Sequence, residues 1–266
     1  KNEVYVKEVD LPEIGEEELL VKVVSNSVCL STYKAAIRGG EHKRVPDDVS
    51  KEHPVITGHE FGGYIVKVGE KLKGQFKEGE KFVLQPAMGL SNGYSAGYSY
   101  EYYGGNATYC IIPKVSIDIG CVLPYDGDYF ANASLAEPMS CIIGAFHATY
   151  HTTPYVYEHK MGLKDGGSVA LLGCAGPMGL GAIDYAVHGP YNSKRVVVTD
   201  INEDRLKRAK SLITPEDAAK NGVELIYVNT KDNEHAVEDL KKLNDGKGYD
   251  ETFVFAPVKP LIEMAD

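Results

Sequence analysis

The feature that most limits the possible folds is a regular alternation of apolar strands and helices over the second half of the chain. Strands and helices are expected in turn, beginning with a strand, at residues 168–172, 180–188, 195–199, 203–213, 224–229, 236–243 and 252–255. Buried strands that alternate with helices are typical of a parallel sheet with helical crossovers. A doubly wound dinucleotide fold has six strands, and only four are counted before Asp266. The chain is then either a reduced version of this fold or a fragment of a longer protein, and we expect a fragment.

The first strand of this half runs into a glycine-rich loop, VALLGCAGPMGLGAI, that leads directly into a helix. Backbone N–H groups at the start of a helix, together with the helix dipole, can hold a pyrophosphate. The usual spacing of such loops is G-x-G-x-x-G, and Cys174 stands where the first of those glycines would fall. The candidate cofactor-binding residues of the loop are Gly173, Gly176, Pro177, Met178 and Gly179.

An acidic residue, Asp200, ends the second strand of this half, 21 residues after Gly179. A carboxylate at this place accepts hydrogen bonds from both ribose hydroxyls of the cofactor and repels a 2′-phosphate. The alternative is that Asp200 only caps the end of its strand. The neighbouring strand, loop and helix favour the cofactor role, so we expect NAD(H) rather than NADP.

A possible metal site lies in the first half, in the segment PVITGHEFGGYIVKVG at residues 54–69. Glycines surround a tight corner at His59 and Glu60, and glycine adopts backbone angles that a sharp corner requires. Cys29 and Glu137 offer a thiolate and a second carboxylate. A catalytic zinc typically has three protein ligands and one open position. Each residue alone has a simpler explanation, as a buried thiol, a core histidine or a charge at a helix start, but the set favours a metal.

The first half as a whole is expected to form a small barrel-like β domain, because short strands recur between glycine and proline turns. The expected strands are residues 4–9, 19–24, 64–68, 81–84 and 107–112. A helical segment follows Cys29, and residues 134–150 have the apolar content of a mostly buried helix or of two short ones. Near residue 150 the short strands between turns give way to alternating strands and helices. This change predicts domains at 1–149 and 150–266. Residues 89–105, rich in Tyr and Gly, are interpreted as an ordered surface loop.

Charge and cysteine content exclude several classes of function. The net charge of −10 argues against binding to a nucleic-acid backbone. A basic cluster around Arg38, His42, Lys43 and Arg44 is interpreted as a solvated loop unless it lies beside the active site. No apolar run is long enough to span a bilayer. Five cysteines, odd in number and irregularly spaced, suit a reducing cytosol. We therefore expect a cytoplasmic protein without a nucleic-acid or membrane partner.

Together these motifs resemble the zinc-dependent medium-chain dehydrogenase/reductase superfamily, which contains the alcohol and sorbitol dehydrogenases. The segment GHEFGGYIVKVG resembles the zinc signature of this family, and GPMG resembles its cofactor loop. Residues 28–31, VCLS, resemble the Cys-x-Ser/Thr segment, and residues 135–138, LAEP, the Glu-Pro segment of polyol dehydrogenases. The combination is most similar to the L-sorbose-1-phosphate reductase branch. The resemblance implies a GroES-like catalytic domain followed by a Rossmann domain, with the family's return to the catalytic domain missing.

The resemblance also implies roles for individual residues. Cys29 and His59 would be zinc ligands, and Ser31 would be the first hydroxyl of a catalytic proton relay. Glu60 matches the carboxylate that completes the metal site in sorbitol-dehydrogenase-like members, and would be both a ligand and a catalytic residue. Glu137 matches a carboxylate that binds zinc directly in some members and through water in others. Which of the two glutamates is the third ligand is left open.

Two departures from the family pattern affect the expected site. The relay histidine of many relatives falls at Lys34, so the exit route of the proton is left open. Many relatives also hold a structural zinc with four closely spaced cysteines, whereas only Cys110 and Cys121 lie in the matching region here. The tyrosine-rich segment 89–105 stands in place of that lobe. We therefore expect one catalytic zinc and no structural zinc.

The function implied by the resemblance is hydride transfer between NAD(H) and a polyol or ketose, with a ketose phosphate such as L-sorbose 1-phosphate as the specific candidate. Zinc would polarise the carbonyl and Ser31 would relay a proton. Arg38, Lys43 or Arg44 could bind the phosphate group of the sugar. The alternatives are an alcohol, polyol or threonine dehydrogenase of the same fold, or a truncated chain that binds NAD or zinc without catalysis. The partner is expected to be a small molecule, and a homo-oligomer is left open.

Overall fold

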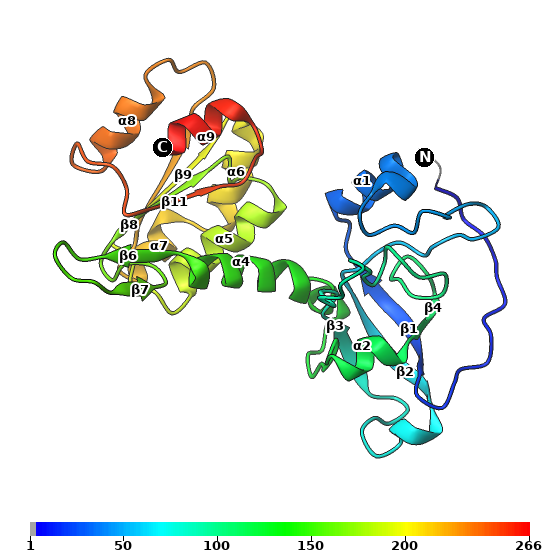
Figure 1. Ribbon diagram of the computed structural model, residues 1–266. Helices are drawn as coiled ribbons and strands as arrows, with labels where there is room; N and C mark the ends of the chain where they lie inside the picture. Colours follow the sequence, from blue (N-terminus) through cyan, green and yellow to red (C-terminus); the bar gives the residue numbers. More distant parts are fainter. Residues whose placement is uncertain (1–3) are drawn as a thin grey trace. The chain divides into compact units, whose positions relative to one another are not determined.

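The computed structural model describes residues 4–266, and the chain divides into two compact units at Pro138–Met139 (Figure 1). This division lies earlier than the expected boundary at 149/150. It falls inside helix α4 (Ala136–Ala148), and the reason is visible in the packing of that helix. Ile142 and Phe146 of α4 are buried in the hydrophobic core of the second unit. Burial of these side chains assigns most of the helix to the second unit.

The first unit contains a five-stranded antiparallel sheet with the strand order β4-β1-β2-β3-β5. Its strands are β1 (Leu19–Asn26), β2 (Phe61–Val68), β3 (Lys81–Leu84), β4 (Tyr109–Ile112) and β5 (Val122–Pro124). Its short helices are α1 (Leu30–Arg38), α2 (Lys114–Asp118) and α3 (Phe130–Ala133), with 3-10 turns at η1 (Gly39–Glu41) and η2 (Glu70–Leu72). The core is built from inward-facing residues such as Leu19, Val21, Phe61 and Phe82. Alternation of buried and exposed residues along β1 and β2 places one face of the sheet on this core.

Two expectations for the first unit are wrong. The segment 4–9 is not a strand, because its backbone joins no ladder within the described residues, and strand-forming side chains alone do not make one. The tyrosine-rich segment 89–105 is not simply a surface loop. Ala96, Tyr98 and Tyr103 are almost completely buried, at 0 to 1% exposure. The hydroxyl of Tyr103 pairs with the Ser116 hydroxyl at 2.6 Å, so the polar end of this ring is satisfied inside the unit.

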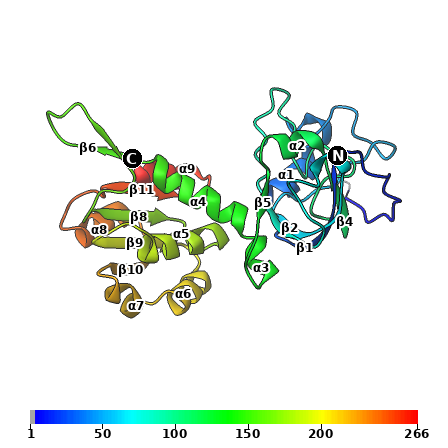
Figure 2. The same ribbon diagram turned by 90° about the horizontal axis from the view of Figure 1, so that it is seen from below.

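The second unit contains a four-stranded parallel sheet with the order β10-β9-β8-β11, which confirms the four expected strands. These are β8 (Ser168–Leu172), β9 (Arg195–Asp200), β10 (Glu224–Asn229) and β11 (Glu251–Val254). The helices are α5 (Pro177–His188), α6 (Glu203–Leu212), α7 (Pro215–Lys220), α8 (Ala236–Leu243) and α9 (Lys259–Ala265). Helix α7 and the hairpin of β6 (Tyr150–Thr152) with β7 (His159–Met161) were not expected. Figure 2 shows this hairpin extending away from the parallel sheet.

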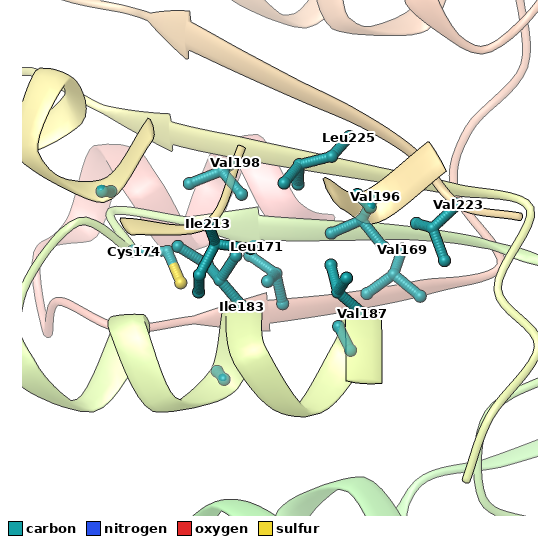
Figure 3. Close-up of a cluster of buried hydrophobic side chains, with 14 of the residues drawn as sticks. Val169, Leu171, Cys174, Ile183, Val187, Val196, Val198, Ile213, Val223 and Leu225 are labelled. Carbon is teal, nitrogen blue, oxygen red and sulfur yellow. The ribbon is translucent and has the colours of Figure 1, made fainter. Parts of the chain in front are cut away.

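Successive residues of the central strands face opposite sides of the sheet, which explains why these strands are continuously apolar. Val169 and Leu171 of β8 lie in one core cluster with side chains of α4, α5 and α6 (Figure 3). Ala170 and Leu172 lie in a second cluster, with Leu240 of α8 and side chains of α9. Helices therefore cover both faces, as the alternating pattern predicts. No helix within residues 4–266 is both long and apolar enough to span a membrane.

A histidine between two aspartates links α5 to α7 and provides a pH-dependent contact. His188 Nδ1 lies 2.8 Å from Asp184 Oδ1, and His188 Nε2 lies 2.9 Å from Asp217 Oδ2. The hydrogen bond with Asp184 raises the pKa of His188 above its ordinary value, burial opposes this, and the bond with Asp217 adds to it. The pKa of Asp217 is lowered by the same histidine, so the two shifts agree.

Replacement of His188 by Gln is therefore expected to destabilise the chain mainly at acidic pH. A raised folded-state pKa contributes stability below the unfolded-state pKa of about 6.5, and this contribution is lost as pH rises through the folded-state value. Urea unfolding of both proteins at about pH 5.5 and about pH 9 measures the difference. An equal loss of stability at both pH values would show that protonation of His188 contributes nothing.

Candidate metal centre

The corner that carries His59 and Glu60 is held by the segment that follows residue 95. Gly58 has a φ of +91°, a left-handed angle that favours glycine. A Cβ on Gly97 would lie 2.2 Å from the Gly58 carbonyl oxygen, so only glycine permits this close approach. The N–H of Gly105 donates to the Gly58 oxygen at 2.7 Å, and the N–H of Asn106 donates to the Thr57 oxygen at 2.8 Å. The tyrosine-rich segment thus fixes the backbone of the corner.

Three potential metal ligands meet at this corner. Cys29 is the N-cap residue of α1, and the chain before it is tied to the corner because the Ser27 N–H donates to the Glu60 carbonyl at 3.0 Å. The ligand atoms of Cys29, His59 and Glu60 all lie within 4.8 Å of one another. His59 Nε2 is 3.7 Å from Glu60 Oε1. Both of these residues are buried, at 5% exposure, and Cys29 is half-buried.

The neutral state of His59 fits a bound cation, whereas Cys29 must lose its proton to bind one. Burial lowers the pKa of His59, Arg44 adds to this and Glu60 opposes it, so the imidazole favours the neutral form that a metal ligand requires. His59 Nδ1 is buried and has no hydrogen-bond partner among the described residues. Burial is also the main cause that raises the pKa of the Cys29 thiol. A thiol, an imidazole and a carboxylate are the donors that zinc accepts, so the residues fit this metal.

The carboxylate of the group is supported from behind by serines. The Ser27 hydroxyl donates to Glu60 Oε2 and also lies 3.0 Å from the Ser134 carbonyl oxygen. The Ser25 hydroxyl donates to Ser134 Oγ at 2.9 Å. Hydrogen-bonded carboxylates keep one orientation, which is a common feature around metal ligands. Nothing in the sequence pattern marks Ser27, since its contact with Glu60 spans 33 residues of chain.

Replacement of Ser27 by Ala is expected to weaken zinc binding by about 10- to 100-fold, because Glu60 would lose the hydrogen bond that orients it. Competition with a chromophoric chelator measures the dissociation constant. Ser25→Ala is the matched control, since Ser25 contacts Ser134 and not Glu60. Equal affinities in the two variants would contradict a role of Ser27 in holding the carboxylate.

Of the other residues expected at this site, Ser31 lies beside the three ligands and Glu137 is not part of their cluster. Ser31 lies beside the group, with its Oγ 2.8 Å from Cys29 Sγ and 2.8 Å from the Tyr98 hydroxyl. Glu137 is half-buried in the first turn of α4 and is not one of the three residues in the cluster, so its role as a ligand stays a prediction. Tyr98 was not singled out from the sequence, where it is one of several tyrosines in a glycine-rich segment.

The glycine loop of the second unit joins β8 directly to α5. Gly173 follows β8 with a φ of +65°, and α5 begins at Pro177, whose missing N–H costs nothing at this position. A Cβ on Gly179 would lie 1.7 Å from the Cys174 carbonyl oxygen, so this glycine is required for the loop to pack on the helix. Gly176, by contrast, is the N-cap residue of α5 and has open space around its Cβ position.

Asp200 lies at the carboxyl end of β9 and holds the same loop. Its Oδ2 accepts a hydrogen bond from the Ala175 N–H at 3.0 Å, and its Oδ1 accepts one from the Asn202 N–H at 2.9 Å. The side chain is buried. An ionised carboxylate accepts about four hydrogen bonds, so each oxygen retains capacity for a ribose hydroxyl. The loop and the acid expected to bind the cofactor therefore lie side by side.

Comparison with known proteins agrees with this combination of fold and site. Residues 15–124 match the model of the alcohol dehydrogenase GroES-like domain. The parallel sheet of the second unit has the Rossmann-like arrangement expected beside that domain. The first unit therefore resembles the GroES-like domain of alcohol dehydrogenases, and the whole chain is similar to members of the medium-chain dehydrogenase/reductase superfamily.

Individual relatives are similar over the full length of the chain. The mannitol-1-phosphate 5-dehydrogenase of Aliivibrio fischeri is 65% identical over 266 residues, and the L-sorbose 1-phosphate reductase of Klebsiella pneumoniae is 40% identical over 267 residues. Each alignment covers 100% of this chain, which spans 63% of each relative. The crystal structure of galactitol-1-phosphate dehydrogenase from Escherichia coli has a TM-score of 0.66 at 22% identity, and the match covers 99% of this chain and 68% of that one.

Proposed function

We propose that the protein is a zinc-dependent oxidoreductase that transfers hydride between NAD(H) and a phosphorylated polyol or ketose. The observation that carries the proposal is the cluster of Cys29, His59 and Glu60 within 4.8 Å. The same chain carries a glycine loop joined to Asp200 in its second unit. A metal centre without the loop, or the loop without a metal centre, would support a much broader range of functions.

The roles of the residues follow from their chemistry. Cys29, His59 and Glu60 would hold the metal, and Glu137 is a further carboxylate that we propose for it. A bound zinc supplies Lewis-acid polarisation of the substrate oxygen. Ser31 would exchange a proton with that oxygen, since its hydroxyl lies beside Cys29.

In the second unit, the N–H groups of the loop at Gly173–Gly179 would hold the pyrophosphate of the cofactor. Pro177 and Met178 lie in the first turn of α5, within that loop. Asp200 would accept hydrogen bonds from the ribose hydroxyls and exclude a 2′-phosphate, which favours NAD(H) over NADP(H). Bound NAD(H) supplies the hydride.

A phosphorylated substrate is proposed because two relatives, at 65% and 40% identity, carry the names of phosphorylated substrates. Arg44 is the best candidate of the basic cluster to bind the phosphate. Its guanidinium carbon lies 5.2 Å from the centre of the Tyr98 ring, and the hydroxyl of that ring contacts Ser31. Arg38 and Lys43 are exposed and have no such contact with the metal group among the described residues.

Replacement of Arg44 by Gln is therefore expected to raise KM for mannitol 1-phosphate or L-sorbose 1-phosphate by about 10- to 100-fold, the usual loss for a charge-assisted hydrogen bond. KM for unphosphorylated sorbitol should stay unchanged. The test compares zinc-loaded wild type, Arg44→Gln and the control Lys43→Gln on phosphorylated and neutral substrates, including threonine, with NADH and NADPH or their oxidised forms. Equal losses on both substrate types would contradict the phosphate contact. Binding of NADH and zinc without turnover would indicate a non-catalytic binding chain.

Charge and cysteine chemistry support a further part of the proposal, that the protein acts in the cytoplasm on a small molecule alone. The chain has a net charge of −10, which disfavours a nucleic-acid partner. Cys29, Cys110, Cys121 and Cys174 are free thiols, as expected in a reducing compartment.

A further inference from the structure

We propose that Tyr98 is a positioning residue of the metal centre, whose hydroxyl orients the Ser31 hydroxyl and whose ring holds the His59 imidazole in place. The inference rests on the proposed function but concerns a residue outside the expected ligand and relay set. It also addresses the departure at Lys34, because it gives Ser31 a hydrogen-bond partner within the chain.

The first part of the argument is the hydrogen bond between two hydroxyls. Tyr98 is 1% exposed, and its hydroxyl donates to Ser31 Oγ at 2.8 Å. A serine hydroxyl has one proton to donate and two lone pairs that accept. Because Tyr98 occupies a lone pair, the Ser31 proton is left for a second partner. Cys29 Sγ lies 2.8 Å away and accepts this proton when Cys29 is a thiolate, and a substrate oxygen is the partner in the proposed reaction.

The second part concerns the contacts of the ring. The centres of the Tyr98 and His59 rings are 4.9 Å apart with 34° between their planes. The His42 ring lies parallel to the Tyr98 ring, within 3°, at a centre distance of 5.6 Å, and the Arg44 guanidinium carbon lies 5.2 Å from the ring centre. The ring therefore contacts both the basic loop and a buried metal ligand. Its displacement would free the imidazole to turn away from Cys29.

The third part is the way in which the backbone fixes the ring. Gly97, directly before Tyr98, has a φ of +71° and packs against the Gly58 carbonyl, next to His59. The Ser99 hydroxyl, directly after it, donates to the Arg44 carbonyl at 2.5 Å. Anchors on both sides leave the ring little freedom, which is what a positioning residue requires.

The chain offers a matched control in Tyr103. It is equally buried, lies in the same segment and also pairs its hydroxyl with a serine, Ser116, at 2.6 Å. Its ring packs against Phe61 and Tyr100 in the core rather than against a potential metal ligand. A purely structural role of a buried tyrosine would therefore give similar effects for Tyr98→Phe and Tyr103→Phe.

The test uses four single variants, Tyr98→Phe, Tyr98→Leu, Ser31→Ala and Tyr103→Phe, with Co²⁺ in place of zinc. Tyr98→Phe keeps the ring and should shift the thiolate-to-cobalt absorption band in the same direction as Ser31→Ala, because both alter the hydrogen bond to Cys29. Tyr103→Phe should leave the band unchanged. Tyr98→Leu removes the ring and should raise the metal dissociation constant by at least about 10-fold.

In turnover, Tyr98→Phe should lower kcat by about 10- to 100-fold with little change in KM. The double variant Tyr98→Phe/Ser31→Ala should be no slower than Ser31→Ala alone, since Tyr98 acts through Ser31. An unshifted band in Tyr98→Phe, or independent and additive losses in the double variant, would overturn the role of the hydroxyl. An unchanged metal affinity in Tyr98→Leu would overturn the role of the ring. Absence of turnover in the wild type would contradict the proposed function, while the cobalt spectra would still decide the role of Tyr98.

Discussion

Replacement of Cys29 by Ser is expected to abolish stoichiometric zinc binding. The wild-type chain, washed with a weak chelator and loaded with zinc, should retain one zinc per chain by elemental analysis. A serine hydroxyl stays protonated at neutral pH and is a far poorer zinc ligand than a thiolate. Since loss of an outer-shell partner costs about 10- to 100-fold in affinity, loss of a direct ligand should cost more than about 100-fold.

The affinity should also fall at acidic pH, because the Cys29 thiol has a pKa raised mainly by burial and must lose its proton to bind the metal. Cys141→Ser is the control, since this cysteine is exposed and is not part of the cluster. Retention of one zinc in Cys29→Ser would contradict the assignment of the ligands. Two zincs in the wild type would contradict the expectation of a single site.

Replacement of Gly179 by Ala is expected to disrupt the cofactor loop and destabilise the second unit. The added Cβ would lie 1.7 Å from the Cys174 carbonyl oxygen, and a backbone atom cannot rotate away as a side chain can. Overpacking of this kind typically costs about 1–3 kcal/mol, and the displaced loop would no longer present its N–H groups correctly. Urea unfolding and titration of NADH by its fluorescence measure the two effects.

Gly176→Ala is the matched control for folding, because its Cβ would have no atom within 4 Å and the backbone has an ordinary extended conformation. Since alanine is a poorer N-cap residue than glycine, the unfolding free energy of this variant should fall by at most about 1 kcal/mol, less than in Gly179→Ala. If Gly179→Ala were as stable as Gly176→Ala and bound NADH equally well, the close packing of loop and helix would not matter for the cofactor.

The parallel sheet was the part of the fold that could be predicted best. Its strands are continuously apolar, and helix and strand periods are properties of a few neighbouring residues. The limits of α8 were predicted without error, whereas α5 begins three residues earlier than expected, because Pro177 is well suited to the first position of a helix. The segment 4–9 has the composition of a strand but no partner within the described residues, so local preference alone did not decide its structure.

The candidate site shows the same division between local and distant information. Cys29, His59, Glu60 and Asp200 could be named from the sequence, because their residue types and the glycines near them carry the chemistry of metal and cofactor binding. Ser27 and Tyr98 could not, because serine and tyrosine have many uses in a fold. Tyr98 meets Ser31 across 67 residues of chain, and Ser27 meets Glu60 across 33.

By itself, therefore, the sequence determined the strands of the parallel sheet, the presence of two units and the chemical identity of the donors. The tertiary structure alone decided which buried groups surround those donors: Ser27 behind the carboxylate, and Tyr98 between Ser31 and His59. The physical reason is that residue type and hydrophobic period act over a few neighbouring residues. Hydrogen bonds and ring contacts between distant segments exist only after the chain has packed them together.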